Sequence, residues 1–240
     1  MTTKGVAVLD KLKIILPLAA LLVLALSPSA GAAPSVLGTS GNILTPDDTI
    51  VAPGGVNFGY HAITDFAGGS DTLNIYCANI GLLPKLEVGA AVVTNGGSEV
   101  IINGKYRILS EGEGRPAVTV GLVDAGAQLT HRRGAYILLS KNLTTFAEEL
   151  ADKISRPLRG HLGIGNGAVK DVFVGLDWTL APKFSLMAEY ISDSELTGSD
   201  GEALLNAGIR YALTKEWRLD LGMIDFEDFT FGASYQALKF

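Results

Sequence analysis

The chain has 240 residues, of which 25 are acidic and 19 are basic, giving a formal net charge of −6. This balance argues against nucleic acid as a partner, because binding to phosphates needs a basic surface. The single cysteine, Cys77, excludes an intramolecular disulfide. We therefore expect Cys77 to be a small apolar residue on a strand.

The first 32 residues have the features of a secretion signal. Lys4, Lys11 and Lys13 form a basic start, and the apolar stretch Ile14–Leu26 is shorter than the roughly 20 residues of a membrane-spanning helix. Ala30–Ala32 fits an A-x-A cleavage site. We predict cleavage after Ala32, which changes the formal charge from −6 to −8; an uncleaved anchor helix is the alternative.

Residues 33–54 form a lead segment rich in glycine and proline, before a run of alternating strands over residues 55–240. The pattern leaves open whether this lead is a plug, an extra strand or a disordered segment. Lengths near ten residues match tilted membrane strands. The twelve predicted strands are 55–64, 71–82, 85–94, 99–109, 116–124, 133–143, 159–167, 170–180, 184–192, 203–213, 216–225 and 228–239.

The alternation separates two faces. Over Val100–Ile108 and Asp171–Leu180, apolar residues take every second position, with mostly polar or small residues between them. A soluble sandwich would alternate in the same way. Aromatic residues on the apolar face, many near strand ends, instead favour the interfacial girdles of an antiparallel transmembrane β-barrel. The girdle candidates are Phe58, Tyr60, Tyr106, Trp178, Tyr190, Tyr211 and Trp217.

The connections predict an orientation. Short turns follow the second, eighth and tenth strands, and longer or more polar loops follow odd strands, which places both ends of the barrel on the periplasmic side. One connection, at residues 145–156, has the spacing of a short amphipathic helix. The terminal Phe240 is a candidate barrel-assembly signal, and a β-bulge near Gln236 would bring it into register with the strand.

The polar face carries the candidate functional residues. These charged or ionisable side chains should face the lumen, where they either contact a passing solute or pair and seal the barrel. They are Glu87, Lys105, Arg107, Arg133, His161, Asp171, Asp177, Glu189, Arg210, Arg218 and Asp220.

The sequence offers little support for other chemistry. His61, His131 and His161 lack a metal-ligand spacing, so we predict no metal and no cofactor. An enzyme would need His161 to meet a serine and an acid across the lumen, and no motif identifies that serine.

Several segments resemble one family. The motifs are residues 37–48, 83–89, 103–107, 116–124 and 159–165, which are similar to those of YjbH-like outer-membrane proteins associated with exopolysaccharide production. The resemblance covers most of residues 37–215, although the chain is much shorter than a typical member. It implies a membrane barrel linked to surface polysaccharide and supplies no catalytic residues.

These observations predict a twelve-stranded barrel in the bacterial outer membrane. The first hypothesis is a pore or export component for a polar solute or polysaccharide. The second is a plugged structural or adhesion barrel that acts through its outer loops, and the third is a lipid-modifying barrel enzyme. The expected partners are outer-membrane lipid, the barrel-assembly machinery and a polysaccharide.

Overall fold

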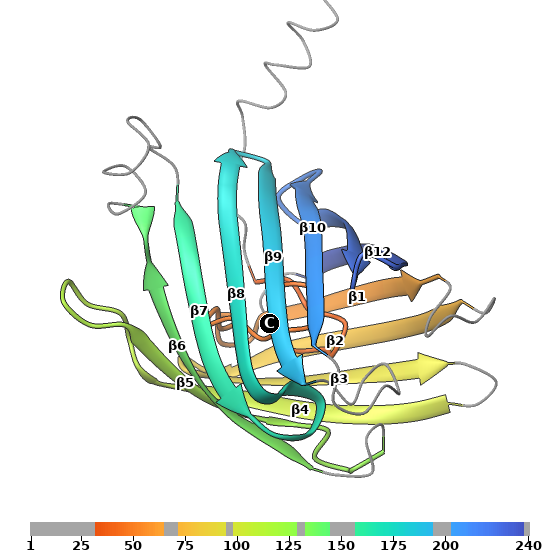
Figure 1. Cartoon of the computed structure of the whole chain (residues 1–240), viewed down its shortest axis with the longest axis horizontal. Coiled ribbons are helices and arrows are strands. Elements are labelled where there is room, and N and C mark those ends of the chain that lie inside the picture. Colours follow the sequence, from red (N-terminus) through yellow and green to blue (C-terminus); the bar gives the residue numbers. More distant parts are fainter. Residues whose placement is uncertain are drawn as a thin grey trace, which may run out of the picture.

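The computed structural model describes residues 32–64, 72–94, 98–128, 133–144, 157–193 and 203–237. They form a closed barrel of twelve antiparallel strands, in which each strand pairs with its sequence neighbours and β1 pairs with β12 (Figure 1). A short 3-10 turn, η2 (Gly167–Val169), precedes β8. The strands are β1 (Val56–Ile63), β2 (Leu73–Leu83), β3 (Leu86–Thr94), β4 (Ser98–Leu109), β5 (Ala117–Val123), β6 (Gly134–Asn142), β7 (Leu158–Gly165), β8 (Lys170–Ala181), β9 (Phe184–Asp193), β10 (Leu204–Ala212), β11 (Trp217–Ile224) and β12 (Asp228–Ala237).

The predicted barrel and its twelve strands are confirmed, with boundaries that differ by a few residues. The predicted helix at residues 145–156 and the terminal Phe240 lie outside the described residues. The pairing of β12 is regular as far as Ala237 with β1 and as far as Tyr235 with β11. The β-bulge expected near Gln236 is therefore absent from the described part of β12.

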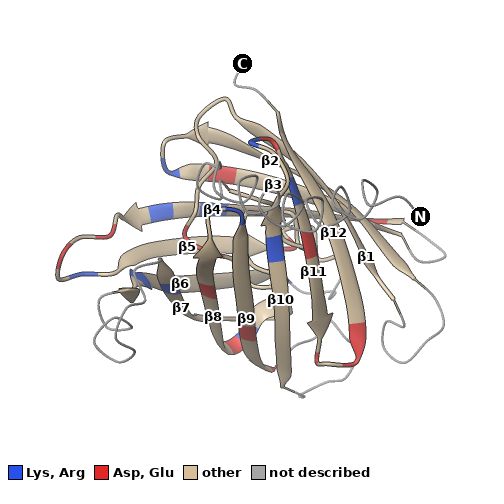
Figure 2. Ribbon diagram, turned by 90° about the horizontal axis from the view of Figure 1, so that it is seen from above, with Lys and Arg blue, Asp and Glu red and all other residues tan. Residues whose placement is uncertain are grey.

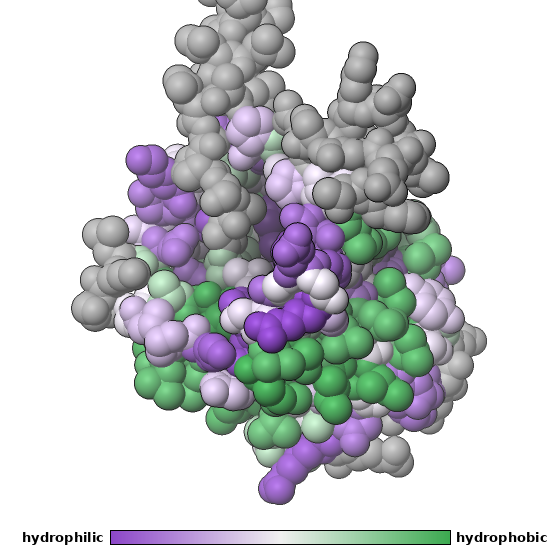
Figure 3. Space-filling model, turned by 90° about the vertical axis from the view of Figure 1, so that its left-hand side faces the viewer, coloured by the Kyte–Doolittle hydropathy of each residue, from purple (hydrophilic) through white to green (hydrophobic). Residues whose placement is uncertain are grey.

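The outer face of the barrel is apolar. Side chains such as Leu122, Ile137 and Ile164 are more than half exposed, and Figure 3 shows an apolar belt with hydrophilic residues along its edges. All seven predicted girdle aromatics lie on strand positions that face outward, and Phe58, Tyr106, Tyr190 and Trp217 are among the exposed large apolar residues. Among the described residues, no helix is long and apolar enough to cross a membrane.

The two halves of the lumen differ in polarity. We call the end at which β1 begins and β12 ends the near end, and the opposite end the far end. The charged inward residues gather in the near half and the middle. The far half is a buried apolar core. Its wall residues include Ile63, Leu73, Ile75, Val93, Ile101, Val123, Tyr136, Phe173, Ile191, Leu204 and Ile224.

Two inward aromatic rings of this core lie over glycines of the neighbouring strand. Tyr136 is paired with Gly121, and Phe173 is paired with Gly163. A Cβ atom added at Gly163 would lie 2.0 Å from the Phe173 ring, and one at Gly121 would lie 2.2 Å from Tyr136. The rings contact each other edge to face, with centroids 6.0 Å apart. Glycine at these positions therefore makes room for the rings that fill the far half.

We expect Gly163→Ala to destabilise the barrel by about 1–3 kcal/mol, because a buried Phe173 ring cannot move aside without disturbing the packed core. The measurement is the urea concentration at which half of the protein has lost the heat-modifiable gel migration of a folded barrel. Gly114→Ala is the matched control, because a Cβ there meets nothing within 4 Å. Equal midpoints for the two variants would contradict this account of the core.

Candidate functional site

The lead segment is folded inside the lumen. We call residues 32–51 the plug; every residue from Ala32 to Asp48 is buried. Isolated bridges join Pro34 to Ser40 and Gly41 to Pro46, so the segment is a compact pair of turns. In Figure 1 this orange-red segment lies within the curve of the strands. Of the three possibilities left open by the sequence, a plug is the one that the structure contains.

The plug contacts the wall through both apolar packing and close backbone approach. Its four large apolar side chains, Val36, Leu37, Ile43 and Leu44, belong to the same buried core as the far half of the lumen. Gly38 has a φ of +99°, which favours glycine. A Cβ atom added at Gly89 of β3 would lie 2.6 Å from the Gly38 carbonyl oxygen, so the two backbones touch there.

Glu189 of β9 binds the middle of the plug. Its carboxylate accepts hydrogen bonds from the backbone N–H groups of Ile43, Leu44 and Thr45, at 2.8 to 3.2 Å, and from the Thr45 hydroxyl at 2.7 Å. Asn206 of β10 donates a further hydrogen bond at 3.1 Å. Glu189 is 2 % exposed. A single buried carboxylate thus satisfies three successive backbone donors that the turn leaves without a carbonyl partner.

Glu87 of β3 has the same role on the opposite side. Its carboxylate accepts hydrogen bonds from the Ser40 backbone at 2.6 Å, the Ser40 hydroxyl at 2.7 Å and the Val51 backbone at 2.9 Å. Asn79 of β2 donates to the same carboxylate at 3.1 Å. Glu87 therefore joins the middle of the plug to its exit toward β1.

Lys105 of β4 is a buried cation that binds the plug. Its ammonium donates to the carbonyl oxygens of Ser40 and Asp47, at 2.6 and 3.1 Å, and forms an ion pair with the Asp47 carboxylate at 3.1 Å. Lys105 is 1 % exposed. A buried ammonium is tolerated only with such a complete set of partners. The plug supplies all three.

Three arginines of the wall contact the middle and the later part of the plug. Arg107 donates to the Asp48 carbonyl oxygen, and Arg159 pairs with the Asp48 carboxylate at 3.0 Å and with Glu111 at 3.0 Å. Arg210 pairs with Asp220 at 2.8 Å and donates to the carbonyl oxygens of residues 41 and 42. Figure 2 shows a basic position part-way along β10 beside an acidic position on β11.

His161 connects a serine and an acid, as the enzyme hypothesis requires. The Ser140 hydroxyl lies 2.8 Å from His161 Nδ1, and His161 Nε2 lies 2.9 Å from the Asp177 carboxylate. However, Ser140 is 1 % exposed and His161 is 2 % exposed, so Oγ has no room for a substrate carbonyl in this state. A nucleophile needs such access. We therefore interpret the trio as a structural network between β6, β7 and β8.

Two predicted lumen residues lie elsewhere. Arg133 is exposed just before β6 begins, on the outward parity of that strand. Asp171 is also exposed, with a φ of +56° in a register shift between β8 and β9. Arg218 is buried in the wall and reaches Gln236 at 3.4 Å. The remaining nine candidates, Arg218 included, lie on lumen-facing strand positions, and Glu87, Lys105, Arg107, Glu189 and Arg210 contact the plug.

The sequence reasoning missed several residues of the site. Asp47 and Asp48 are not among the predicted lumen residues, because nothing local shows that a lead segment enters the barrel. Arg159 precedes the clear alternation of its strand. Asn103 donates to the Leu37 carbonyl oxygen and lies on the same parity as Lys105, so the alternation could have identified it.

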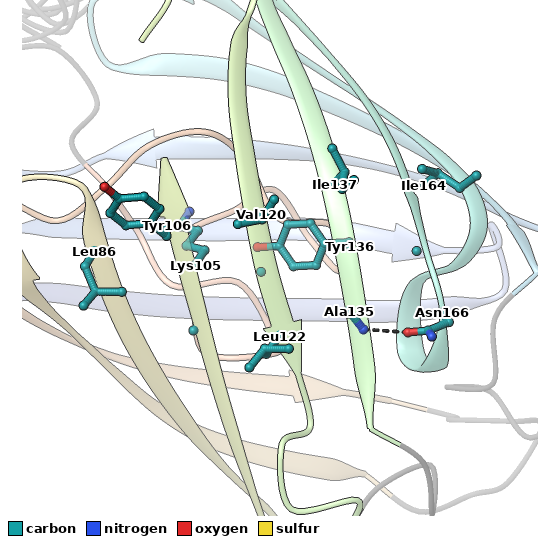
Figure 4. Close-up of a pocket in the computed structure, with 13 residues that line it drawn as sticks. Leu86, Lys105, Tyr106, Val120, Leu122, Ala135, Tyr136, Ile137, Ile164 and Asn166 are labelled. Carbon is teal, nitrogen blue, oxygen red and sulfur yellow. Dashed lines mark hydrogen bonds between the residues drawn. The ribbon is translucent and has the colours of Figure 1, made fainter. Parts of the chain in front are cut away.

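Two kinds of cavity adjoin the barrel wall. One, of about 250 Å³, lies between the plug and strands β7 to β10 and is lined by Asp47, Arg159, Asp177 and Arg210 among others. The other is an outward groove of about 690 Å³ over β3 to β7, shown in Figure 4. Leu86, Leu122 and Ile164 line the groove. It lies over Gly104, which faces outward and has no side chain to fill the space. The groove belongs to the apolar outer surface and not to the lumen.

The Asp47 carboxyl makes seating of the plug sensitive to acid. Burial by itself would raise its pKa, but the charge of Lys105, with smaller effects from His161 and Thr49, holds the pKa below its ordinary value. Because the pKa of Asp47 is lower in the folded protein than in the unfolded chain, its ionisation stabilises the folded state. This contribution is complete above the pKa of the unfolded chain, near 3.8, and is lost as the pH falls through the pKa of the folded protein.

We therefore expect the hydrogen-exchange rate of the plug amides, divided by the intrinsic rate at each pH, to be constant from pH 8 to pH 5 and to rise below about pH 4. Asp47→Asn should remove part of that rise. A rise that begins near pH 6 would point to a histidine instead.

No protein-family model and no curated protein matches this sequence. Solved structures with a similar fold include a KdgM porin, with 8 % identity, coverage of 77 % of this chain and 99 % of that chain, and a TM-score of 0.49. The outer-membrane protein Omp33 of Acinetobacter baumannii has 9 % identity, coverage of 78 % and 97 %, and a TM-score of 0.44. At these values the likeness carries no argument about what this chain binds.

Proposed function

We propose that this protein is a bacterial outer-membrane β-barrel that is closed at rest by its own N-terminal plug and that passes polar solutes only when the plug is displaced. The observation that carries the proposal is the set of polar contacts from Glu87, Lys105 and Glu189 to the plug. The outward apolar belt supports the membrane location, because lipid accepts strands only in a closed barrel.

Polar anchoring distinguishes a displaceable plug from a purely structural core. Charged side chains of the wall bind plug backbone groups that water can also satisfy, so a displaced plug leaves hydrated charges along the near half of the lumen. The apolar far half favours the second hypothesis, a permanently plugged barrel, because it lacks the polar lining of an open channel. Polysaccharide as the solute is suggested only by the resemblance to YjbH-like proteins.

The test is single-channel conductance of the refolded mature chain in a planar bilayer. We expect the wild type to insert and to remain silent, and a variant with Glu87→Gln and Glu189→Gln to give ion-selective steps. Heat-modifiable migration of both proteins on gels provides the control for insertion of a folded barrel. Open steps in the wild type would contradict the resting plug. A silent double variant whose plug amides exchange freely would favour the structural barrel instead.

A further inference from the structure

The cavity of about 250 Å³ at the near end is bounded by both the plug and the wall. Asn42, Asp47 and Thr49 line it from the plug, and residues of β7 to β10 line it from the wall. Its volume equals that of roughly eight waters and lies just below the roughly 300–1,000 Å³ of sites for drug-sized ligands. The cavity therefore suits a ligand of about ten non-hydrogen atoms or fewer.

The charges around this cavity are balanced. Two carboxylates, Asp47 and Asp177, face two guanidinium groups, Arg159 and Arg210. Arg159 and Asp177 are directly opposite each other in the register of β7 and β8, yet Arg159 pairs with Asp48 and Glu111, and Asp177 pairs with His161. Both side chains remain 27 % exposed, so each can accept a further contact.

This arrangement selects among classes of ligand. A ligand with a net charge would add an uncompensated charge to a largely enclosed space, which is costly. A zwitterion instead places its carboxylate at Arg159 and its ammonium at Asp177, and these charge-assisted hydrogen bonds are the strong ones. Asn42, whose amide nitrogen is buried without a hydrogen-bond partner, also lines the cavity, as do the hydroxyl-bearing Thr179 and Ser185 of the wall.

The geometry points to a binding site for a small zwitterion of amino-acid size between the plug and the wall, occupied while the plug is seated. This inference rests on the proposed function, because the site is complete only with the plug in place. A ligand that binds the seated state and not the displaced state stabilises the seated state by mass action. Such a zwitterion therefore keeps the barrel closed.

The experiment measures binding of L-serine to the refolded wild-type barrel by titration calorimetry, with D-glucose and acetate as neutral and anionic probes. We expect saturable binding of L-serine, no binding of the other two probes, and slower hydrogen exchange of plug amides at saturation. Asp177→Asn and Thr179→Val should each weaken binding, the first at least tenfold. Neither residue is hydrogen-bonded to the plug in this structure, so the seated plug should persist in both.

Asp171→Asn is the matched control for Asp177→Asn, because it removes the same charge from an exposed far-end position. This variant should bind L-serine as the wild type does. A flat titration with a protected plug overturns the zwitterion site and leaves the proposed function intact. Binding of D-glucose in place of L-serine overturns the ligand class. An unprotected plug in the wild type overturns the proposed function itself.

Discussion

Glu189→Gln is expected to release the plug in a barrel that otherwise keeps its fold. The glutamine amide places an N–H₂ group where the carboxylate accepts from the backbone of Ile43, Leu44 and Thr45. If the amide nitrogen takes the Oε1 position, Ile43 and Thr45 lose their acceptor; if it takes the Oε2 position, it meets the donating amide of Asn206 and leaves Leu44 only its 3.2 Å contact. A buried polar group left without its partner costs about 1–3 kcal/mol. Exchange of the three amides should accordingly rise by about tenfold to a hundredfold, since 1.4 kcal/mol is tenfold.

The measurement is hydrogen exchange of peptides that cover residues 36–50, with amides of β2 and β3 as internal references. Glu99→Gln is the matched control, because Glu99 lies on β4 and is exposed. It should leave plug exchange unchanged. If the plug amides of the Glu189→Gln variant are as protected from exchange as those of the wild type, then apolar packing alone holds the segment.

Lys105→Met is expected to have a comparable effect for a different reason. The substitution leaves the Asp47 carboxylate buried without its ion partner, and the carbonyl oxygens of Ser40 and Asp47 without a donor. Removing one partner of a buried pair costs about 3–5 kcal/mol. Asp47→Asn should cost less, because Lys105 keeps both carbonyl partners.

A double variant measures how much of these effects comes from the contact between Lys105 and Asp47. We expect Lys105→Met with Asp47→Asn to be less destabilised than the sum of the single variants, with a coupling of about 0.5–3 kcal/mol for residues in direct contact. Plug exchange and the urea midpoint provide the two readouts. Lys215→Met, in the exposed turn before β11, controls for loss of a lysine. Strict additivity would mean that the ion pair contributes nothing to seating the plug.

The local alternation of apolar and polar residues was sufficient to predict the barrel. Alternation has a period of two residues, so it assigns each side chain of a strand to one face without knowledge of its partners. This placed Glu87, Lys105 and Glu189 inside and Phe58 and Trp217 outside. The rule failed where strand geometry ends: Asp171 lies in a register shift, and Arg133 lies before its strand begins.

What fills the lumen was decided only by the tertiary structure. Glu87 and Glu189 bind residues 47 and 144 to 146 positions away in sequence, and no local signal links a strand carboxylate to such distant backbone donors. The lead segment has no repeating pattern of its own, because its backbone donors are satisfied partly by its own turns and partly by wall side chains, and not by a ladder. The sequence by itself thus determined which residues face inward. Closure of the barrel determined that the plug, and not a solute, is what they bind at rest.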